Sequence, residues 1–88
     1  MKDLKNKVAA ITGAASGIGR MLAVNMANQR CRLAIADIDE AGLKETAALI
    51  GDQVKVSTHI VDVSKREQVF RFAEEAAGHH GEIGRAHV

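Results

Sequence analysis

The feature that most constrains the fold of this chain is a glycine-rich stretch, Thr12-Gly13-Ala14-Ala15-Ser16-Gly17-Ile18-Gly19. It follows a short apolar run, Val8–Thr12, typical of a buried strand, and it precedes apolar residues with helical spacing. At a strand-to-helix junction the free backbone N–H groups and the positive helix end favour a phosphate. Gly13 would allow a tight turn, Gly17 would let the backbone approach a pyrophosphate, and Gly19 would let the helix pack closely on the sheet. We therefore predict a dinucleotide-binding loop; the alternative is that the glycines serve only the turn. A P-loop is excluded because Arg20 stands where its Lys-Ser/Thr pair would be required.

Apolar runs and segments of helical spacing alternate along the whole chain. The expected strands are Val8–Thr12, Arg32–Asp37 and 54–61, and the expected helices run from Gly17 to about Asn28, from the Asp39 cap to Gly51 and from Ser64 to about Gly78. Strands separated by helices in this way pair in parallel through right-handed crossovers. The predicted fold is α/β: the N-terminal half of a Rossmann-type doubly wound parallel sheet (βαβαβα), truncated, with strands in the spatial order 3-2-1.

Capping residues and apolar spacing define the expected helices further. Asp39 is placed to cap the second helix and Gly51 to end it. Ser64 and Glu67 have the spacing of a capping box at the start of the third. In the first helix the apolar residues with helical spacing are Ile18, Leu22 and Met26, with Met21 and Ala23 alongside, and Met21 and Met26 are expected in the core. The residues expected to pack inward are Leu43, Ala47 and Ile50 in the second helix, and Val69, Phe70 or Phe72, Ala73 and Ala76 in the third.

Acidic residues end the second and third expected strands. Asp37 lies 18 residues after Gly19, where a carboxylate can accept both hydroxyls of an adenosine ribose and would repel a 2′-phosphate. Ile38 beside it offers no positive charge for such a phosphate, so NAD is favoured over NADP as cofactor. The alternative is that Asp37 only begins a turn. Asp62 could accept a bond from the adenine amino group while Val63 packs near the ring, but a plain turn role for Asp62 is nearly as well supported by the spacing.

Composition and charge exclude several other classes of function. The net charge is +1 and the basic residues are scattered, which argues against a surface for nucleic acid or anionic membrane. The apolar run at Val8–Ile11 is too short for a signal peptide or a membrane span. The single cysteine, Cys31, indicates no oxidising compartment, so we expect a cytoplasmic protein with Cys31 as a packed or loop thiol. The four histidines, His59, His79, His80 and His87, have no completing ligand at metal-site spacing, so no metal is expected.

These residues together resemble the short-chain dehydrogenase/reductase family over residues 5 to about 81. The Thr12-Gly13-x-x-x-Gly17-x-Gly19 spacing matches the glycine pattern of that family, Asp37 its NAD-selecting acid, and Asp62-Val63 its adenine-contacting pair. Ser16 stands where NADP-preferring members often carry Arg or Lys. The resemblance implies an NAD(P)-dependent enzyme that transfers a hydride between the cofactor and an alcohol or carbonyl substrate, and a parent protein that is a homo-oligomer. A cofactor site of Gly13, Ser16, Gly17, Ile18, Gly19, Asp37, Ile38, Asp62 and Val63 follows from the spacing and the resemblance together.

The family's catalytic residues are expected beyond this stretch of chain. The resemblance implies a later Ser and a Tyr-x-x-x-Lys pair, and the 88 residues contain no tyrosine, so no catalytic residue is assigned here. The alternatives are a catalytically inactive dinucleotide-binding fragment and, less favoured by the glycine spacing, another kind of Rossmann-like protein. Residues 1–81 are expected to form the NAD(P)-binding half-domain. Residues 82–88 read as a translation of GAG ATC GGA AGA GCA CAC GTC, which resembles the start of a widely used sequencing adapter, and we predict that this tail is not native.

Overall fold

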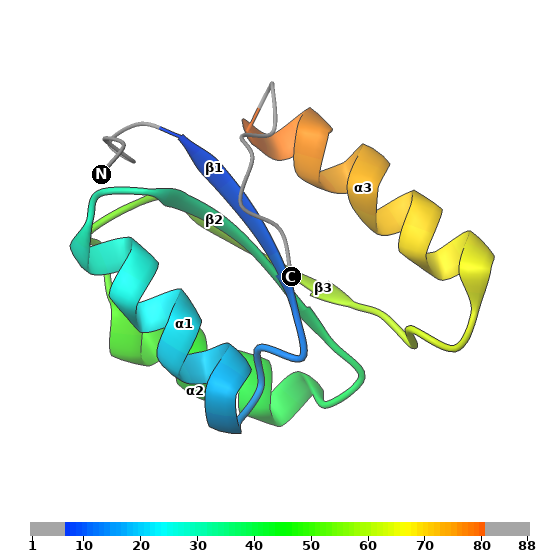
Figure 1. Cartoon of the computed structure of the whole chain (residues 1–88), viewed down its shortest axis with the longest axis horizontal. Helices are drawn as coiled ribbons and strands as arrows, with labels where there is room; N and C mark the ends of the chain where they lie inside the picture. The colour runs from blue at the N-terminus through cyan, green and yellow to red at the C-terminus, as the bar shows by residue number, and fades with distance from the viewer. Residues whose placement is uncertain (1–6, 81–88) are drawn as a thin grey trace.

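The computed structural model describes residues 7–80 of the chain, and within them strands and helices alternate (Figure 1). The elements are β1 (Val8–Thr12), α1 (Gly17–Asn28), β2 (Arg32–Asp37), α2 (Glu40–Ile50), β3 (Val56–Ile60) and α3 (Arg66–His80). The predicted βαβαβα order is confirmed. β3 is shorter than the predicted strand over 54–61, and α3 continues past Gly78.

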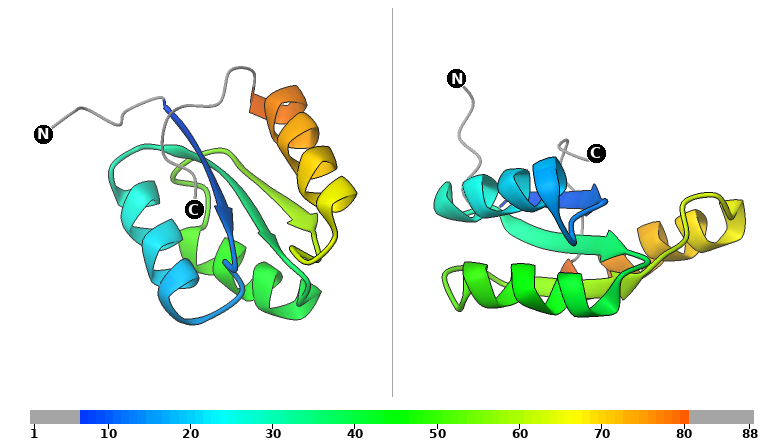
Figure 2. Two further views of the ribbon diagram at one scale, coloured as in Figure 1. Left: turned by 45° about the vertical axis from the view of Figure 1, so that its right-hand side comes forward. Right: turned by 90° about the horizontal axis from the view of Figure 1, so that it is seen from below.

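The strands form a parallel sheet in the order β1-β2-β3, as predicted, which the right-hand view of Figure 2 shows from top to bottom. Thr12 of β1 pairs with Ala36 of β2, and Asp37 of β2 pairs with Ile60 of β3. All three strands therefore end at one side of the sheet. We call this side the carboxyl edge, defined by Thr12, Asp37 and Ile60.

The two faces of the sheet carry different side chains because successive residues of a strand point to opposite faces. α1 and α2 cover one face and α3 covers the other (Figures 1 and 2). The α1/α2 face has the larger core, to which the strands contribute Ala9, Ile11, Leu33 and Ile35. The α3 face is built from small strand residues with one aromatic ring over them; its members are Ala10, Ala34, Ala36, Val61, Phe72 and Ala76.

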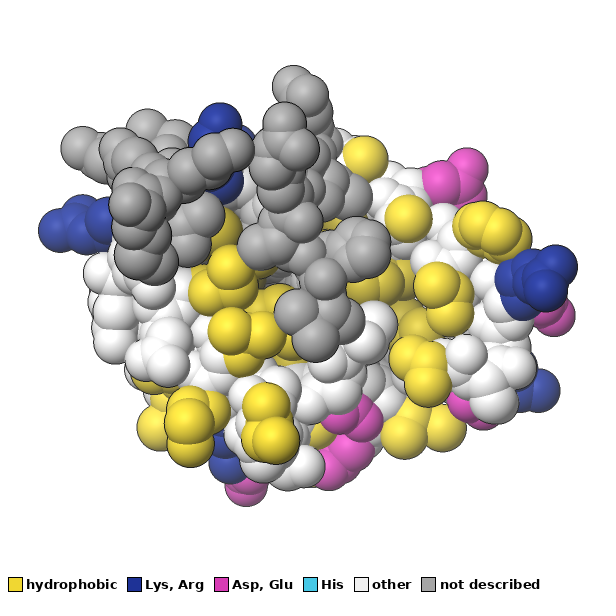
Figure 3. All heavy atoms as spheres, in the orientation of Figure 1, with side chains coloured by type: hydrophobic (Ala, Val, Ile, Leu, Met, Phe, Trp, Pro, Cys, Tyr) yellow, Lys and Arg dark blue, Asp and Glu magenta, His cyan; other side chains and the backbone are white. Residues whose placement is uncertain are grey.

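The inward-facing residues of α1 differ from the prediction. Ala23, Met26 and Ala27 are buried and Leu22 is partly buried, but Met21 is 65% exposed, so its assignment to the core is wrong. Ile18 is 86% exposed. The helix packs through Ala23 and Ala27, at i and i+4, and this rotation leaves Ile18 and Met21 exposed. Figure 3 shows hydrophobic side chains beside acidic ones along the lower rim, where α1 and α2 begin.

α3 also buries fewer residues than its sequence pattern predicts. Phe72 and Ala76, at i and i+4, are buried against the sheet, whereas Val69, Phe70 and Ala73 are exposed. The ring of Phe72 packs on the alanines of this face of the sheet. Of the two phenylalanines left open by the spacing, the structure selects Phe72.

The helix caps match the prediction in α2 but not in α3. The side chain of Asp39 accepts a hydrogen bond from the Gly42 N–H at 3.0 Å, and Gly51 follows the last residue of α2 with a φ of 68°. At α3 the capping-box prediction is wrong, because the Ser64 hydroxyl donates to Asp62 Oδ1 instead of capping the helix. α3 begins two positions beyond Ser64, so the Ser64 hydroxyl is committed to the preceding turn.

Candidate functional site

Three glycines shape the connection from β1 to α1, and we call residues 13–17, which end on the first residue of α1, the glycine loop. Gly13 and Gly17 have φ values of +69° and +57°, which other residues adopt only with strain, and open space lies where their Cβ atoms would be. A Cβ on Gly19 would overlap the carbonyl oxygen of Gly13. Gly19 therefore allows α1 to pack closely on the glycine loop itself, in addition to any close packing on the sheet.

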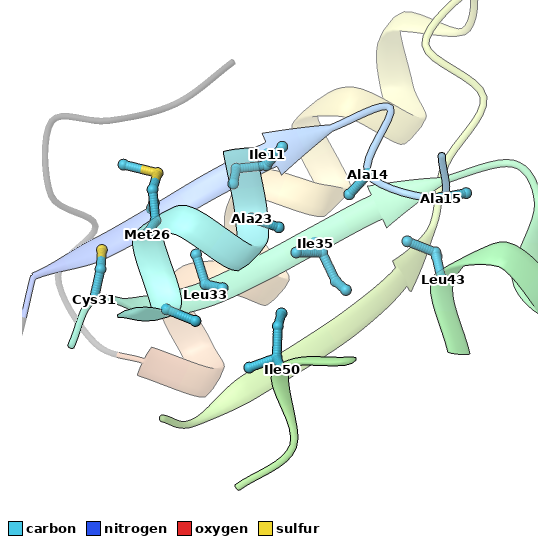
Figure 4. Close-up of a cluster of buried hydrophobic side chains, with 12 residues drawn as sticks. Ile11, Ala14, Ala15, Ala23, Met26, Cys31, Leu33, Ile35, Leu43 and Ile50 are labelled. Atoms are coloured by element: carbon cyan, nitrogen blue, oxygen red, sulfur yellow. The ribbon is translucent and has the colours of Figure 1, made fainter. Parts of the chain in front are cut away.

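The alanines between these glycines anchor the loop in the core. Ala14 and Ala15 are 0% and 2% exposed, and Figure 4 shows Ala15 beside Leu43 of α2. The Ala14 N–H donates to the Ala36 carbonyl at 3.1 Å. A Cβ on Gly42 would lie 2.7 Å from Ala15 Cβ and 2.8 Å from its carbonyl oxygen, so α2 packs against the loop through a glycine. The glycine pattern does not specify the residues between its glycines, and it does not include Gly42. The packing of Ala14, Ala15 and Gly42 was therefore not predicted from the sequence.

Asp37 lies at the carboxyl edge and contacts the glycine loop directly. Its Oδ2 accepts a hydrogen bond from the Ala15 N–H at 3.1 Å, and its Oδ1 accepts one from the Asp39 N–H at 3.1 Å. The second bond stabilises the turn into α2, so the turn role considered from the sequence is part of what Asp37 does. Each carboxylate oxygen can accept a further bond. The carboxylate is therefore fixed beside the loop with acceptor capacity remaining.

Arg20 is a functional candidate that sequence reasoning used only to exclude a P-loop. Its guanidinium donates through Nη2 to the carbonyl oxygens of Ala15 and Gly42, the latter at 3.0 Å, and to Glu45 Oε1 at 3.0 Å. Its Nε donates to Thr46 Oγ1 at 2.8 Å. The Arg20 side chain is 27% exposed. One residue of α1 thus binds the glycine loop and the first two turns of α2 together.

Thr46 extends this network into the interior. It is fully buried, and its hydroxyl lies 2.7 Å from the Ala14 carbonyl oxygen and 3.1 Å from that of Gly42. Since a hydroxyl has one proton to donate, the shorter contact with Ala14 is the better bond. The carbonyl groups of both loop alanines are therefore held by side chains.

The N-termini of α1 and α2 lie at the same edge but differ in how they are capped. Ser16 precedes α1 without capping it by its side chain, and the first turn of α1 has no acidic residue. α2 has the Asp39 cap and an acidic Glu40. Gly13 and Gly17 leave open space at the loop, because no atom lies within 4 Å of the positions that their Cβ atoms would take. The loop therefore fits a phosphate-bearing ligand, since the first N–H groups of a helix have no intrahelical partner.

The remaining predicted site residues also lie along the carboxyl edge. Ile18, Ile38 and Val63 are 86%, 65% and 63% exposed. The Val61 N–H donates to the Asp37 carbonyl at 3.0 Å, which brings the end of β3 to the end of β2.

Asp62, just after β3, is tied to its own turn. Its Oδ1 accepts hydrogen bonds from the Ser64 hydroxyl at 2.6 Å and the Ser64 N–H at 3.0 Å, and its N–H donates to Gln68 Oε1 at 2.8 Å. The hydrogen bonds from Ser64, with the nearby charge of Lys65, lower the pKa of the Asp62 carboxyl. Asp62 therefore serves the turn, and its place at the edge leaves a contact with a ligand open.

A second polar cluster, missed from the sequence, lies between β3 and α3. His59 is 5% exposed; its Nε2 is 2.7 Å from Ser57 Oγ, its Nδ1 is 2.9 Å from Glu75 Oε1, and its ring lies 5.1 Å from that of Phe72. A cavity of about 420 Å³ beside it is lined by His59, Arg71 and Glu75 among others and contains none of the predicted site residues. Within residues 7–80 no group of three or more potential metal ligands occurs.

Comparison with known proteins places this geometry among dehydrogenases. The model of the family described as short chain dehydrogenase matches residues 7–85. The chain is 43% identical over 86 residues to the protein named "Putative oxidoreductase SadH" of Mycobacterium tuberculosis, a match that covers 94% of this chain and 30% of that protein. None of the helices in the described part of the chain is long and apolar enough to traverse a bilayer.

Solved structures of such enzymes superpose closely on the chain. A short chain dehydrogenase/reductase from Burkholderia phymatum in complex with NAD has a TM-score of 0.89 and 37% identity, and covers 94% of this chain and 30% of its own. A 3-ketoacyl-(acyl-carrier-protein) reductase from Brucella melitensis complexed with NADH has a TM-score of 0.83 and 36% identity, with 91% and 32% covered. The chain spans about a third of the length of the proteins it matches.

Proposed function

This chain belongs to the short-chain dehydrogenase family, and we propose that it is the cofactor-binding part of an oxidoreductase that uses NAD to interconvert an alcohol and a carbonyl compound. The observation that carries the proposal is the Asp37 carboxylate, held 3.1 Å from the Ala15 N–H of the glycine loop. This contact supports the proposal because it holds a carboxylate that could accept from ribose hydroxyls beside a loop that could bind phosphate. Similarity to the two solved structures in complex with NAD or NADH supports the same cofactor.

Each group of residues has a distinct part in holding the cofactor. The start of α1 and the open backbone at Gly13 and Gly17 would bind the pyrophosphate through N–H groups. Asp37 would accept hydrogen bonds from the ribose hydroxyls. The exposed side chains of Ile38 and Val63 would pack against the adenine and so be removed from water. When bound, the dinucleotide supplies the carbon that accepts or donates the hydride, and these residues orient it.

The preference for NAD over NADP follows from charge. A 2′-phosphate carries between one and two negative charges, and at about 4 Å a unit charge pair is worth roughly 4 kcal/mol at an effective dielectric constant near 20. Exposure of the site to solvent reduces this value, so we expect NADH to bind about 10- to 100-fold more tightly than NADPH, which corresponds to ~1.4–2.8 kcal/mol. Ser16 provides no positive charge to offset the repulsion.

Titration of the protein that contains this chain with NADH and with NADPH tests the proposal. We expect tighter binding of NADH, and we expect Asp37→Asn to reduce the ratio of the two affinities toward one. Asp52→Asn, the same change at an exposed position away from the carboxyl edge, is the matched control and should leave the ratio unchanged. Binding of neither dinucleotide by the unchanged protein would refute the function, whereas equal binding of both would refute only the preference for NAD.

A further inference from the structure

The side chain of Arg20 joins two parts of the carboxyl edge that a dinucleotide would have to touch at once. Its donors meet the Ala15 carbonyl of the glycine loop, the Gly42 carbonyl and the side chains of Glu45 and Thr46 in α2. We call its bonds to Ala15, Gly42 and Thr46 the Arg20 clamp; the exposed ion pair with Glu45 is not part of it. A planar guanidinium can serve several acceptors at fixed angles, which a lysine ammonium on a flexible chain cannot reproduce.

Ala15 is the point where the clamp meets the ribose-binding acid. Its carbonyl oxygen accepts from Arg20 Nη2, and its N–H donates to Asp37 Oδ2 at 3.1 Å. The peptide groups on either side of Ala15 are therefore fixed by two different side chains. The separation between the glycine loop and Asp37 depends on both bonds.

From this geometry we propose that Arg20 is a positioning residue for the dinucleotide. It fixes the glycine loop relative to Asp37, so that one ligand can place its pyrophosphate at the loop and its ribose at the carboxylate together. The inference rests on the proposed function. In this proposal Arg20 acts through the carbonyl groups of Ala15 and Gly42, which Nη2 meets directly.

The physical basis is the cost of ordering the loop when the ligand binds. Gly13 and Gly17 leave the loop with more backbone freedom than other residues would. A loop held in place before binding loses less entropy on binding, so removal of the clamp should weaken any ligand that spans loop and acid. We expect an affinity loss of about tenfold for ADP-ribose, which corresponds to ~1.4 kcal/mol of binding free energy. Adenosine, which lacks the pyrophosphate, should lose about twofold or less, because it needs only the acid side of the site.

A competing explanation is that the positive charge of Arg20 attracts the phosphates. Arg20→Lys separates the two, since it keeps the charge and removes the planar set of donors, whereas Arg20→Gln removes both. Glu45→Gln is the matched control: it neutralises the exposed ion-pair partner of Arg20 and leaves the bonds to the two carbonyl groups intact.

The experiment measures dissociation constants of ADP-ribose by calorimetry and of adenosine by NMR titration for the unchanged protein and the three variants. The proposal predicts a loss of about tenfold for ADP-ribose in both Arg20→Lys and Arg20→Gln, with adenosine and Glu45→Gln nearly unaffected. Hydrogen exchange of the ligand-free protein adds a second readout: the Ala15 amide should exchange faster in Arg20→Lys while the amides of β2 stay protected.

Three results would overturn the inference and leave the proposed function standing. Full ADP-ribose affinity in Arg20→Lys would mean that charge suffices. Equal losses for adenosine and ADP-ribose would mean a general structural role. Unchanged exchange of the Ala15 amide in Arg20→Lys would mean that the clamp does not hold the loop. Failure of the unchanged protein to bind ADP-ribose would refute the proposed function itself and the inference with it.

Discussion

Replacement of Gly42 by alanine sets helix propensity against packing, and the structure predicts which effect is larger. Gly42 lies in the first turn of α2; in the middle of a helix alanine is favoured over glycine by roughly 0.5–1 kcal/mol, and we take this as the largest gain at Gly42. The new Cβ would lie 2.7 Å from Ala15 Cβ, 2.8 Å from the Ala15 carbonyl oxygen and 2.7 Å from Asp39 Oδ2. These contacts are too short for a methyl group, and two of the three partners are held by hydrogen bonds.

The magnitude follows from two costs. Overpacking of a well-packed site costs about 1–3 kcal/mol. Displacement of the Asp39 carboxylate endangers its bond to the Gly42 N–H, and a lost N-cap costs about 1 kcal/mol. With the propensity gain subtracted, Gly42→Ala should lower the free energy of unfolding by about 1–3 kcal/mol.

The assay is urea unfolding followed by circular dichroism, with Gly78→Ala as the matched control. Gly78 lies in α3, its φ is not positive, and a Cβ there would meet no atom within 4 Å. The same substitution should therefore raise the free energy of unfolding, by up to about 0.5–1 kcal/mol. If Gly42→Ala is as stable as the unchanged protein or more so, the packing argument is refuted.

Three further perturbations test other parts of the structure. Gly19→Ala would put a Cβ into the Gly13 carbonyl oxygen, so we expect a loss of more than about 3 kcal/mol in a urea melt; a near-neutral effect would show that the turn adjusts easily. Burial raises the pKa of the Cys31 thiol, so iodoacetamide should label it slowly until the protein is unfolded. Because burial raises the pKa of this thiol in the folded state, the contribution of Cys31 to the free energy of unfolding is complete below the pKa of an unfolded thiol and is lost as pH rises above it. The variant Cys31→Ala should lack this alkaline decline in stability. The lowered pKa of Asp62 has the opposite sign: its stabilisation is present above the ordinary carboxyl pKa and is lost as the pH falls through the folded-state value. Urea midpoints of Asp62→Asn should therefore converge with those of the unchanged protein in acid; a difference that persists there contradicts the assignment.

Local patterns were enough to predict most of the secondary structure. The bounds of β1, α1 and β2 agree with the predictions because each is set by a continuous apolar run or a glycine. The Asp39 cap and the Gly51 terminus of α2 were also predicted, since both depend only on neighbouring residues. The predicted cofactor residues lie together at the carboxyl edge because parallel strands bring their ends to one side. That they bind NAD stays a prediction.

The interactions that could not be predicted join residues far apart in the sequence. Arg20 and Thr46 are 26 positions apart, and nothing near either residue indicates the contact. His59 meets Glu75 across the space between β3 and α3, so its burial depends on where α3 docks. Met21 was misplaced because helical spacing alone does not give the rotation of a helix about its axis. The prediction for residues 82–88 lies outside the described residues and stays a prediction, although the family match continues to residue 85.

The parallel pairing of the sheet also has a consequence for how fast the chain can fold. Val8 pairs with Arg32 and Leu33 with Val56, partners that are 24 and 23 residues apart in the sequence. Each ladder must therefore close a loop of similar length before its first bond forms, and the closure entropy is nearly equal for the two. The loop-closure entropy therefore does not decide which of the two strand pairs forms first. α1, with Ala23 and Ala27 against β1 and β2, and α2, with Leu43 and Ile50, contribute to one shared core, and this favours concerted rather than stepwise formation of the two ladders.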